Sequence, residues 1–327
     1  MLDRKSRSTP SRNSRWAYFF AHTSDAKNRR TWLVFILPAL ILYLLFMAYP
    51  LANSIRLSLY TGRGIVPDQF VGLENFRALF THPVWSFHLF NAIKNTTILF
   101  IVHMGVQNTL GLMFAVLLTN KIRGRNFFRT IIFLPATLSV LVIGFLWSLI
   151  LNPRWGMLNL LLNEIGLDSL ARPWLGDPQL ALIAISLVSC WQWVGLPTMM
   201  YLAALLGISE ELIEAAKVDG ASAWQAFWRI KFPLLAPIIG IVSVLTFIGN
   251  YSAFDIIYAM ASSRGDPEYS TDIMGSFFYR TGIGGAVLTG HVDAGMGAAI
   301  ATIIFFILLF GVLIWLYLTR KQEYDFS

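Results

Sequence analysis

The sequence is poor in charged residues and almost free of cysteine. Only 13% of its 327 residues are Asp, Glu, Lys or Arg, whereas 56% are hydrophobic. This ratio excludes a water-soluble globular domain, because too few polar side chains are present to cover a surface. The single cysteine, Cys190, has no partner within the chain for a disulfide and indicates nothing about a redox compartment.

The sequence also lacks the motifs by which proteins bind nucleotides and metals or hydrolyse substrates. No GxxxxGK[ST] run is present, so the chain has no P-loop to hold nucleotide phosphates. The His and Cys residues are not spaced as the ligands of a metal site are. Ser186 and Ser189 lack the spaced His and Asp partners that a serine hydrolase needs. We therefore expect no catalytic residue, no metal ligand and no cofactor in this chain.

The positive charge of the sequence is concentrated at particular places. The formal net charge is +7, and much of the excess lies in the first thirty residues and beside the ends of apolar runs. That placement follows the positive-inside rule of membrane proteins and does not indicate a nucleic-acid partner.

Long apolar runs separate the charged segments and predict an all-α, polytopic membrane protein. Each run is long enough to cross a hydrocarbon core of roughly 30 Å. The six predicted spans are about Trp32–Tyr49, Thr97–Leu118, Ile131–Leu151, Leu180–Leu206, Leu234–Met260 and Met296–Leu318. Pro197 is expected to kink the fourth span. Basic residues beside the spans predict that both termini are cytoplasmic.

These spans divide the chain into four predicted parts. Residues 1–30 form a basic, mostly disordered cytoplasmic tail, and residues 31–90 hold the first span and an external segment. Residues 91–320 form the main transmembrane domain with a cytoplasmic loop at 209–233, and residues 321–327 form a second cytoplasmic tail.

The loop between the fourth and fifth spans predicts a helix–glycine–helix elbow at the membrane surface. Ser209 is placed to cap a first helix, and Gly220 is placed to end it in a left-handed turn. Ser222 and Gln225 form a capping-box pair that begins a second helix, which Pro233 is expected to end. An ordinary interfacial loop with two short helices is the alternative.

The residues of this elbow resemble the EAA loop of importer-type ABC permeases. The resemblance lies in Glu214-Ala215-Ala216, Gly220, Ile230 and Phe232-Pro233, where Phe232 replaces the leucine usual in that family. In that family the loop is the coupling helix that docks into a groove of a cytoplasmic ATPase. The resemblance therefore implies contact with the ATPase for Glu210, Glu211, Glu214, Ala215, Ala216, Asp219 and Gly220.

Two further segments resemble the carbohydrate group of these permeases. Phe70–Phe80 is similar to a V-G-L-x-N-[YF] segment, and Asn250–Met260 is similar to F-N-x-F-D-x-I-Y. In relatives of the maltose type, the positions matching Thr246, Asn250 and Ala253 contact sugar, although Ala253 lacks the polar group seen there. Hydrogen bonding between helices is the alternative role for these side chains.

The fourth span adds aromatic and polar residues near its proline. Aromatic planes beside hydroxyl and amide groups suit a sugar, whose C–H faces pack on rings while its hydroxyls form hydrogen bonds. We predict that Trp191, Trp193, Gly195 and Thr198 line the same substrate pathway. Interfacial anchoring of the tryptophans is the alternative. His103, Gln107 and Asn108 on the second span are equally compatible with the cavity and with bundle packing.

The resemblance implies the transmembrane domain of a type I ABC importer in a bacterial cytoplasmic (inner) membrane, surrounded by lipid. It implies a sugar-like solute delivered by an extracytoplasmic binding protein, a second and homologous permease, and two ATPase subunits that bind ATP and Mg. An amino-acid or polyamine permease is an alternative. An ion-coupled secondary transporter is another, but it requires buried charges, and the fifth span offers only Asp255.

Overall fold

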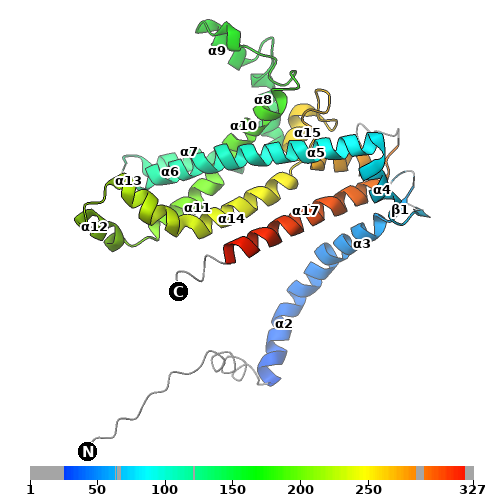
Figure 1. Cartoon of the computed structure of the whole chain (residues 1–327), viewed down its shortest axis with the longest axis horizontal. Helices are drawn as coiled ribbons and strands as arrows, with labels where there is room; N and C mark the ends of the chain where they lie inside the picture. Colours follow the sequence, from blue (N-terminus) through cyan, green and yellow to red (C-terminus); the bar gives the residue numbers. More distant parts are fainter. Residues whose placement is uncertain (1–25, 63, 65–67, 121, 285–290, 321–327) are drawn as a thin grey trace, which may run out of the picture. The chain divides into compact units, whose positions relative to one another are not determined.

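The computed structural model describes residues 26–62, 64, 68–120, 122–284 and 291–320, which are mostly helical (Figure 1). Most of the predicted basic tail, and the predicted tail at 321–327, lie outside these residues. The internal contacts divide the chain into two units, Met1–Arg56 and Leu57–Ser327.

Helices make up nearly all of the secondary structure. In chain order, the α-helices are α2 (Ala26–Tyr43), α3 (Tyr49–Leu57), α4 (Glu74–Thr81), α5 (Pro83–Val102), α6 (Thr109–Thr119), α7 (Arg125–Phe133), α8 (Val140–Ile150), α9 (Met157–Glu164), α10 (Ala181–Trp193), α11 (Gly195–Leu206), α12 (Glu210–Val218), α13 (Ala223–Ala226), α14 (Phe232–Tyr251), α15 (Asp255–Ala261), α16 (Met274–Gly282) and α17 (Ala294–Arg320). The π-helical turns are η1 (Leu44–Ala48), η2 (His103–Asn108) and η5 (Phe227–Lys231), the 3-10 turns are η3 (Leu134–Thr137) and η4 (Asp168–Leu170), and the two strands are β1 (Tyr60–Thr61) and β2 (Gln69–Phe70).

The first unit is one apolar helical run. Helix α2, the π-turn η1 and helix α3 continue into one another, and the segment Val34–Leu57 has the length and composition of a membrane span. None of its strongest apolar window is buried within the structure. Exposed apolar side chains along a whole helix are what a lipid-facing span requires.

The second unit contains the remaining candidate spans. Within the described residues, Pro83–Thr119, Ala223–Tyr251 and Ala294–Tyr317 are single helical runs that are long and apolar enough to cross a membrane. Two bent helix pairs, α7 with α8 and α10 with α11, pass the same test when each pair is taken together. With the span of the first unit, the total is six if each bent pair is one span, as the sequence predicts.

Both bends lie at prolines. The axes of α7 and α8 differ by 97°, and Pro135 stands in the 3-10 turn η3 between them. The axes of α10 and α11 differ by 45°, and Pro197 lies in the first turn of α11. Because proline lacks an N–H and clashes with the preceding turn, it favours a break at these positions. The predicted kink at Pro197 is confirmed.

Several predicted boundaries differ from the structure, including the end of the first span, which is Leu57 instead of Tyr49. The second span begins at Pro83, well before Thr97, because a proline at the first helical position is pre-organised for a helix. Pro233 does not end the helix begun at Ala223. The π-turn η5 precedes this proline and joins α13 to α14 without a break, so the missing N–H falls where the helix is already wider. The fifth span ends at Tyr251 instead of Met260.

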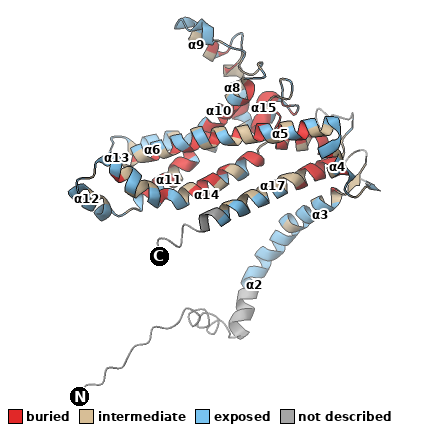
Figure 2. Cartoon of the chain, in the orientation of Figure 1, coloured by how far each residue is buried: buried red, intermediate tan, exposed pale blue. Residues whose placement is uncertain are grey.

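The long helices of the second unit pack side by side. Helices α5, α14 and α17 run along one another, and α6 lies against α11 (Figure 1). Figure 2 shows the buried residues on the inward faces of these helices and on α10, α15 and α16, whereas α9 and α12 are mostly exposed. The elbow at α12 and α13 lies at one end of the long helices, and α4 with β1 lies at the other (Figure 1).

One of the segments that resemble sugar permeases, Phe70–Phe80, contains a buried asparagine, Asn75. The Asn75 side chain is 4% exposed, and its Nδ2 donates hydrogen bonds to the backbone oxygens of Ser58 (2.9 Å) and Tyr60 (2.8 Å). These bonds tie the start of α4 to the residues before and within β1, which pairs antiparallel with β2. The amide therefore has a structural role: it satisfies backbone carbonyls where the chain turns.

The segment between the fifth and sixth spans contains a packed helix, α16. In α16, Arg280 is fully buried and forms an ion pair with the equally buried Asp272. Burial raises the pKa of the Asp272 carboxyl, and the Arg280 guanidinium and the Ser276 hydroxyl oppose that rise. Asn95 on α5 donates to the backbone oxygen of Asp272 (2.9 Å), which fixes this segment on the bundle.

Candidate functional site

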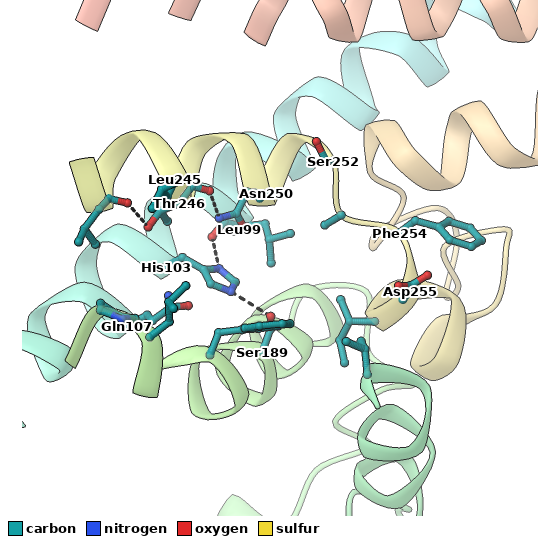
Figure 3. Close-up of a pocket in the computed structure, with 18 of the residues that line it drawn as sticks. Leu99, His103, Gln107, Ser189, Leu245, Thr246, Asn250, Ser252, Phe254 and Asp255 are labelled. Carbon is teal, nitrogen blue, oxygen red and sulfur yellow. Dashed lines mark hydrogen bonds between the residues drawn. The ribbon is translucent and has the colours of Figure 1, made fainter. Parts of the chain in front are cut away.

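A cavity of about 340 Å³ lies within the second unit, where three of its helical runs are irregular (Figure 3). The π-turn η2 contributes His103 and Gln107, the bend between α10 and α11 contributes Trp193 and Pro197, and the break after α14 contributes Ser252, Ala253 and Phe254. Irregular backbone within a membrane is tolerated where it lines a cavity. The coincidence of these three irregularities with one cavity therefore marks a candidate site.

One wall of the cavity carries an oriented histidine. The Nδ1 atom of His103 lies 2.7 Å from the backbone oxygen of Leu99, and its Nε2 lies 3.0 Å from the Ser189 hydroxyl (Figure 3). Because a carbonyl oxygen only accepts, Nδ1 carries the proton. In the neutral ring, Nε2 then accepts from Ser189. The serine oxygen keeps lone pairs that can accept a ligand hydroxyl.

The opposite wall is a polar strip on α14. Asn250 donates from Nδ2 to the backbone oxygen of Thr246 (2.7 Å), and the Thr246 hydroxyl donates to the backbone oxygen of Val242 (2.8 Å). Thr246 also accepts from Asn108 Nδ2 on η2 (3.2 Å). Asn108 does not line the cavity, so its amide ties η2 to α14 behind the wall. These bonds hold the side chains of Thr246 and Asn250 in fixed orientations at the cavity surface.

Gln107 is the polar lining residue with an unmet hydrogen-bonding need. Its Oε1 atom is buried and has no hydrogen-bond partner among the described residues. An unpaired buried carbonyl costs about 1–3 kcal/mol, so native proteins keep such groups where they have a role. Rotation about the terminal torsion of Gln107 can bring this oxygen to a hydroxyl in the cavity, which removes the cost.

The charge of the lining is low. Among the described residues, the lining contains one acidic residue, Asp255 at the start of α15, and no Lys or Arg. A carboxylate at a helix N-terminus is favoured by the helix dipole, which gives Asp255 a structural role of its own. Aromatic, aliphatic and neutral polar groups make up the remaining surface and suit an uncharged polar solute.

The structure brings together four of the seven residues predicted for the substrate pathway. Trp193, Thr246, Asn250 and Ala253 line the cavity. Thr246 and Asn250 share one face of α14, as expected. Ala253 lies beyond the end of that helix and reaches the cavity because the chain turns there.

The other three predicted pathway residues lie outside the lining. Trp191 packs edge-on against Trp147, with ring centroids 5.5 Å apart. Thr198 is fully buried and donates to the backbone oxygen of Val194 (2.7 Å). Gly195 allows close helix packing, because a Cβ there would lie 2.7 Å from the backbone oxygen of Ile132. None of these three residues lines this cavity.

Sequence reasoning leaves several lining residues unassigned. Ser252 and Phe254 line the cavity because α14 ends at Tyr251. The residues between α14 and α15 include no glycine or proline, and the nearest glycine, Gly249, lies within the last turn of α14. From the sequence, Ser189 is notable only as a possible nucleophile, and its contact with His103 across two helices is what gives it a place in the site.

The elbow has the local structure that its sequence predicts. The Ser209 hydroxyl accepts from the Glu211 N–H (3.2 Å), and Ser222 and Gln225 form a reciprocal capping box. Gly220 has a φ of +81°, so the first helix ends in the left-handed turn expected of glycine.

The outer surface of the elbow is unusually open. Helix α12 has no buried residue, and Glu210, Glu211, Glu214, Ala215, Asp219 and Gly220 are exposed while Ala216 is half-buried. Two large apolar residues of this helix are exposed as well, Leu212 at 51% and Val218 at 88%. Val218 is not among the residues predicted for coupling. Leu212 and Val218 give this short helix exposed apolar surface that a partner can cover.

Comparisons with known proteins agree with the fold and with the resemblance. A family described as "Binding-protein-dependent transport system inner membrane component" matches residues 107–321. The chain is similar to the probable ABC transporter permease protein YurN of Bacillus subtilis, with 34% identity covering 84% of this chain and 91% of the relative. It is also similar to the lactose transport system permease protein LacF of Rhizobium radiobacter, with 36% identity covering 76% of this chain and 81% of the relative.

A solved structure has the same fold. A chain from a bacterial ABC transporter involved in the import of the acidic polysaccharide alginate superposes with a TM-score of 0.75 and 25% identity, covering 90% of this chain and 96% of that one. The predicted all-α, polytopic fold is thereby confirmed.

Proposed function

The chain belongs to the family of binding-protein-dependent transport system inner membrane components, and we propose that it is the permease subunit of an ATP-driven importer for a sugar or sugar-like solute. The single observation that carries this proposal is the cavity at the helix breaks. It is lined by neutral polar and aromatic side chains in a chain whose relatives include a lactose permease.

The cavity offers the two kinds of contact that a sugar needs. The ring of Trp193 presents apolar surface for the C–H face of a pyranose ring, whereas the Phe254 ring packs on Tyr258 and Tyr279. The Gln107 oxygen and the Ser189 hydroxyl accept hydrogen bonds from sugar hydroxyls, and Asn250 lies across the cavity from them. A charged amino acid or polyamine would require counter-charges, of which the described lining supplies Asp255 alone.

The elbow supplies the mechanical link to ATP hydrolysis. We assign α12 to the groove of an ATPase subunit, with Glu214 as a charged anchor and the small residues Ala215 and Ala216 permitting close approach. ATP and Mg are bound by the ATPase subunits, because this sequence has no P-loop. Movement of the elbow is transmitted through α13 and η5 directly into α14, since these form one continuous helix that carries the polar cavity wall.

The complete importer requires further chains. A second, homologous permease and two ATPase subunits complete the membrane complex, and an extracytoplasmic binding protein delivers the solute. Both termini and the elbow lie on the cytoplasmic side of a bacterial inner membrane, as the basic residues beside the spans indicate. The outward-open and inward-open states must differ in their affinity for solute, because equal affinities would shift no equilibrium.

Deletion of this chain in its host, followed by uptake measurements, tests the proposal. Labelled disaccharides and oligosaccharides, amino acids and polyamines are supplied in parallel to the deletion strain and to a complemented strain. We expect the loss of uptake of a saccharide, restored by the intact chain and reduced when the complementing gene carries Asn250→Ala. Loss of amino-acid or polyamine uptake with saccharide uptake unchanged would contradict the assigned substrate class.

A further inference from the structure

Two arginines on α7 have buried guanidinium nitrogens without acceptors. Arg125 and Arg129 are one turn apart, so they project from the same side of the helix. Nε and Nη2 of Arg125 and Nε of Arg129 are buried and have no hydrogen-bond partner among the described residues. Both side chains are only half-buried as a whole, so rotation about their terminal torsions can bring the guanidinium groups to an acceptor outside this chain.

No carboxylate of the described chain neutralises this pair. The ion pairs found in the described residues are Arg77–Glu74 and Arg280–Asp272, and neither involves α7. Arginine stays charged at any physiological pH and presents a planar fork of donors that matches a phosphate group. Two arginines without a carboxylate partner among the described residues therefore offer a site for an external anion with several acceptor oxygens.

The surroundings of the two arginines are apolar. Phe127 is 65% exposed, Phe128 45% and Ile131 47%, so α7 presents large apolar side chains next to its charged ones. Helix α7 also forms the first half of a candidate membrane span that is bent by 97°, and α7 begins directly after Gly124. At the end of a span, a headgroup lies level with the arginines and acyl chains lie beside the phenylalanines.

We propose that Arg125 and Arg129 form a binding site for the phosphate group of an anionic phospholipid. A lipid is favoured over a free phosphate or a nucleotide because the exposed apolar residues lie on the same helix as the arginines. It is favoured over an acidic protein surface because α7 and α8 together form a candidate membrane span and large apolar side chains on α7 are exposed. The site is separate from the sugar cavity and does not depend on the proposed transport function.

Native mass spectrometry of the purified full-length chain in detergent tests this site. The chain is titrated with phosphatidylglycerol and, in parallel, with zwitterionic phosphatidylcholine. We expect tighter retention of phosphatidylglycerol. The double variant Arg125→Gln with Arg129→Gln should lower that affinity roughly tenfold or more, because charge-assisted hydrogen bonds to the phosphate are lost. The charge-matched control, Arg123→Gln with Arg229→Gln, removes two exposed arginines at the same end of the molecule and should retain the lipid.

A conservative variant and two competitors make the result decisive. Arg125→Lys with Arg129→Lys keeps the charge and should recover part of the affinity, which separates loss of binding from loss of folding. Equal retention of both lipids, or an equal loss in the control, would overturn the site. Displacement of phosphatidylglycerol by inorganic phosphate or ATP would assign it to a soluble ligand. Loss of a co-purified ATPase with lipid retention unchanged would assign the arginines to a protein contact.

Discussion

At the scale of single residues, the polar groups of the cavity lining differ in whether they have a hydrogen-bond partner within the described part of the protein. His103 and Thr246 use their hydrogen-bonding atoms within the protein, which fixes their geometry before any solute arrives. The Gln107 oxygen is buried without a partner among the described residues. In a membrane interior this arrangement costs stability, and such costs are typical of residues kept for function.

Replacement of Gln107 by leucine should therefore stabilise the protein and impair transport. Removal of the unpaired oxygen is expected to raise the melting temperature in detergent by about 2–4 °C, corresponding to about 1 kcal/mol. Loss of one hydrogen bond to the solute should lower saccharide uptake by about tenfold. Thermal melting of the purified chain and uptake by cells measure the two effects.

Gln192 provides the matched control for this prediction. Its Oε1 is also buried without a partner in the described part of the chain, but Gln192 does not line the cavity. Gln192→Leu should leave uptake close to that of the unmodified chain. A Gln107→Leu protein that transports normally would show that the unpaired oxygen does not contact the solute.

At the scale of elements, the elbow depends on one backbone conformation. Gly220 has a φ of +81°, and nothing among the described residues lies within 4 Å of the position where its Cβ would be. A side chain therefore meets no steric obstacle from neighbours, and the restriction on this residue is the backbone conformation itself. The turn sets the direction of α12 relative to α13, whose helix continues into α14.

Gly220→Val should abolish saccharide uptake while solute binding to the external receptor persists. Valine is β-branched and disfavours positive φ, so the turn is expected to change and α12 to lose its position against the ATPase. Gly220→Asn should keep substantial uptake, because asparagine tolerates this conformation. Uptake by cells and receptor binding in solution provide the measurements.

Gly166→Val tests whether the effect is specific to the elbow. Gly166 also has a positive φ, +75°, with no described atom within 4 Å of its Cβ position, but it lies in the segment after α9, far along the chain from the elbow. Comparable backbone strain there should leave uptake largely intact. Equal losses from both valine variants would mean that general destabilisation, and not coupling, explains the Gly220 result.

At the scale of the whole molecule, long-range contacts hold the segment between α15 and α16 against the bundle. Asp272 pairs with Arg280 and accepts from Ser276 (2.7 Å), while Asn95 and Thr96 on α5 bond the backbone beside it. Burying an ion pair costs desolvation free energy. Removing one partner costs more, because the other charge stays buried without compensation. The pair therefore makes this end of the molecule a single packed unit.

Asp272→Asn should destabilise the protein strongly. Arg280 is left buried without its counter-charge, which is expected to cost about 3–5 kcal/mol and to lower the melting temperature by roughly 5–10 °C. Glu74→Gln breaks the other ion pair, whose side chains are 65–72% exposed, and should cost less than about 1 kcal/mol. Thermal melting of both variants in the same detergent measures the difference. Similar shifts for the two would show that Asp272 contributes no more than a surface charge.

Local sequence patterns are enough to predict the elbow and most of the spans. The caps at Ser209 and Ser222 and the left-handed turn at Gly220 involve only neighbouring residues, so their outcome does not depend on the rest of the fold. The helix end expected at Pro233 is the exception, because the π-turn η5 lets the helix continue through it.

The composition of the cavity follows from tertiary structure. Trp191 and Trp193 are equally aromatic and only two residues apart, but positions two apart on a helix face different sides, and Trp193 is the one that faces the cavity. The break after Tyr251 carries no glycine or proline, and it brings Ala253 and Phe254 to the lining.

The sequence by itself determined an all-α, polytopic membrane protein with a capped elbow, because hydropathy, capping and turn preferences act over a few residues at a time. Only the tertiary structure decided which polar side chains meet in the cavity and that Asp272 and Arg280 are buried as a pair. The physical reason is that a side chain's environment in a bundle is set by neighbouring helices, which come from distant parts of the chain.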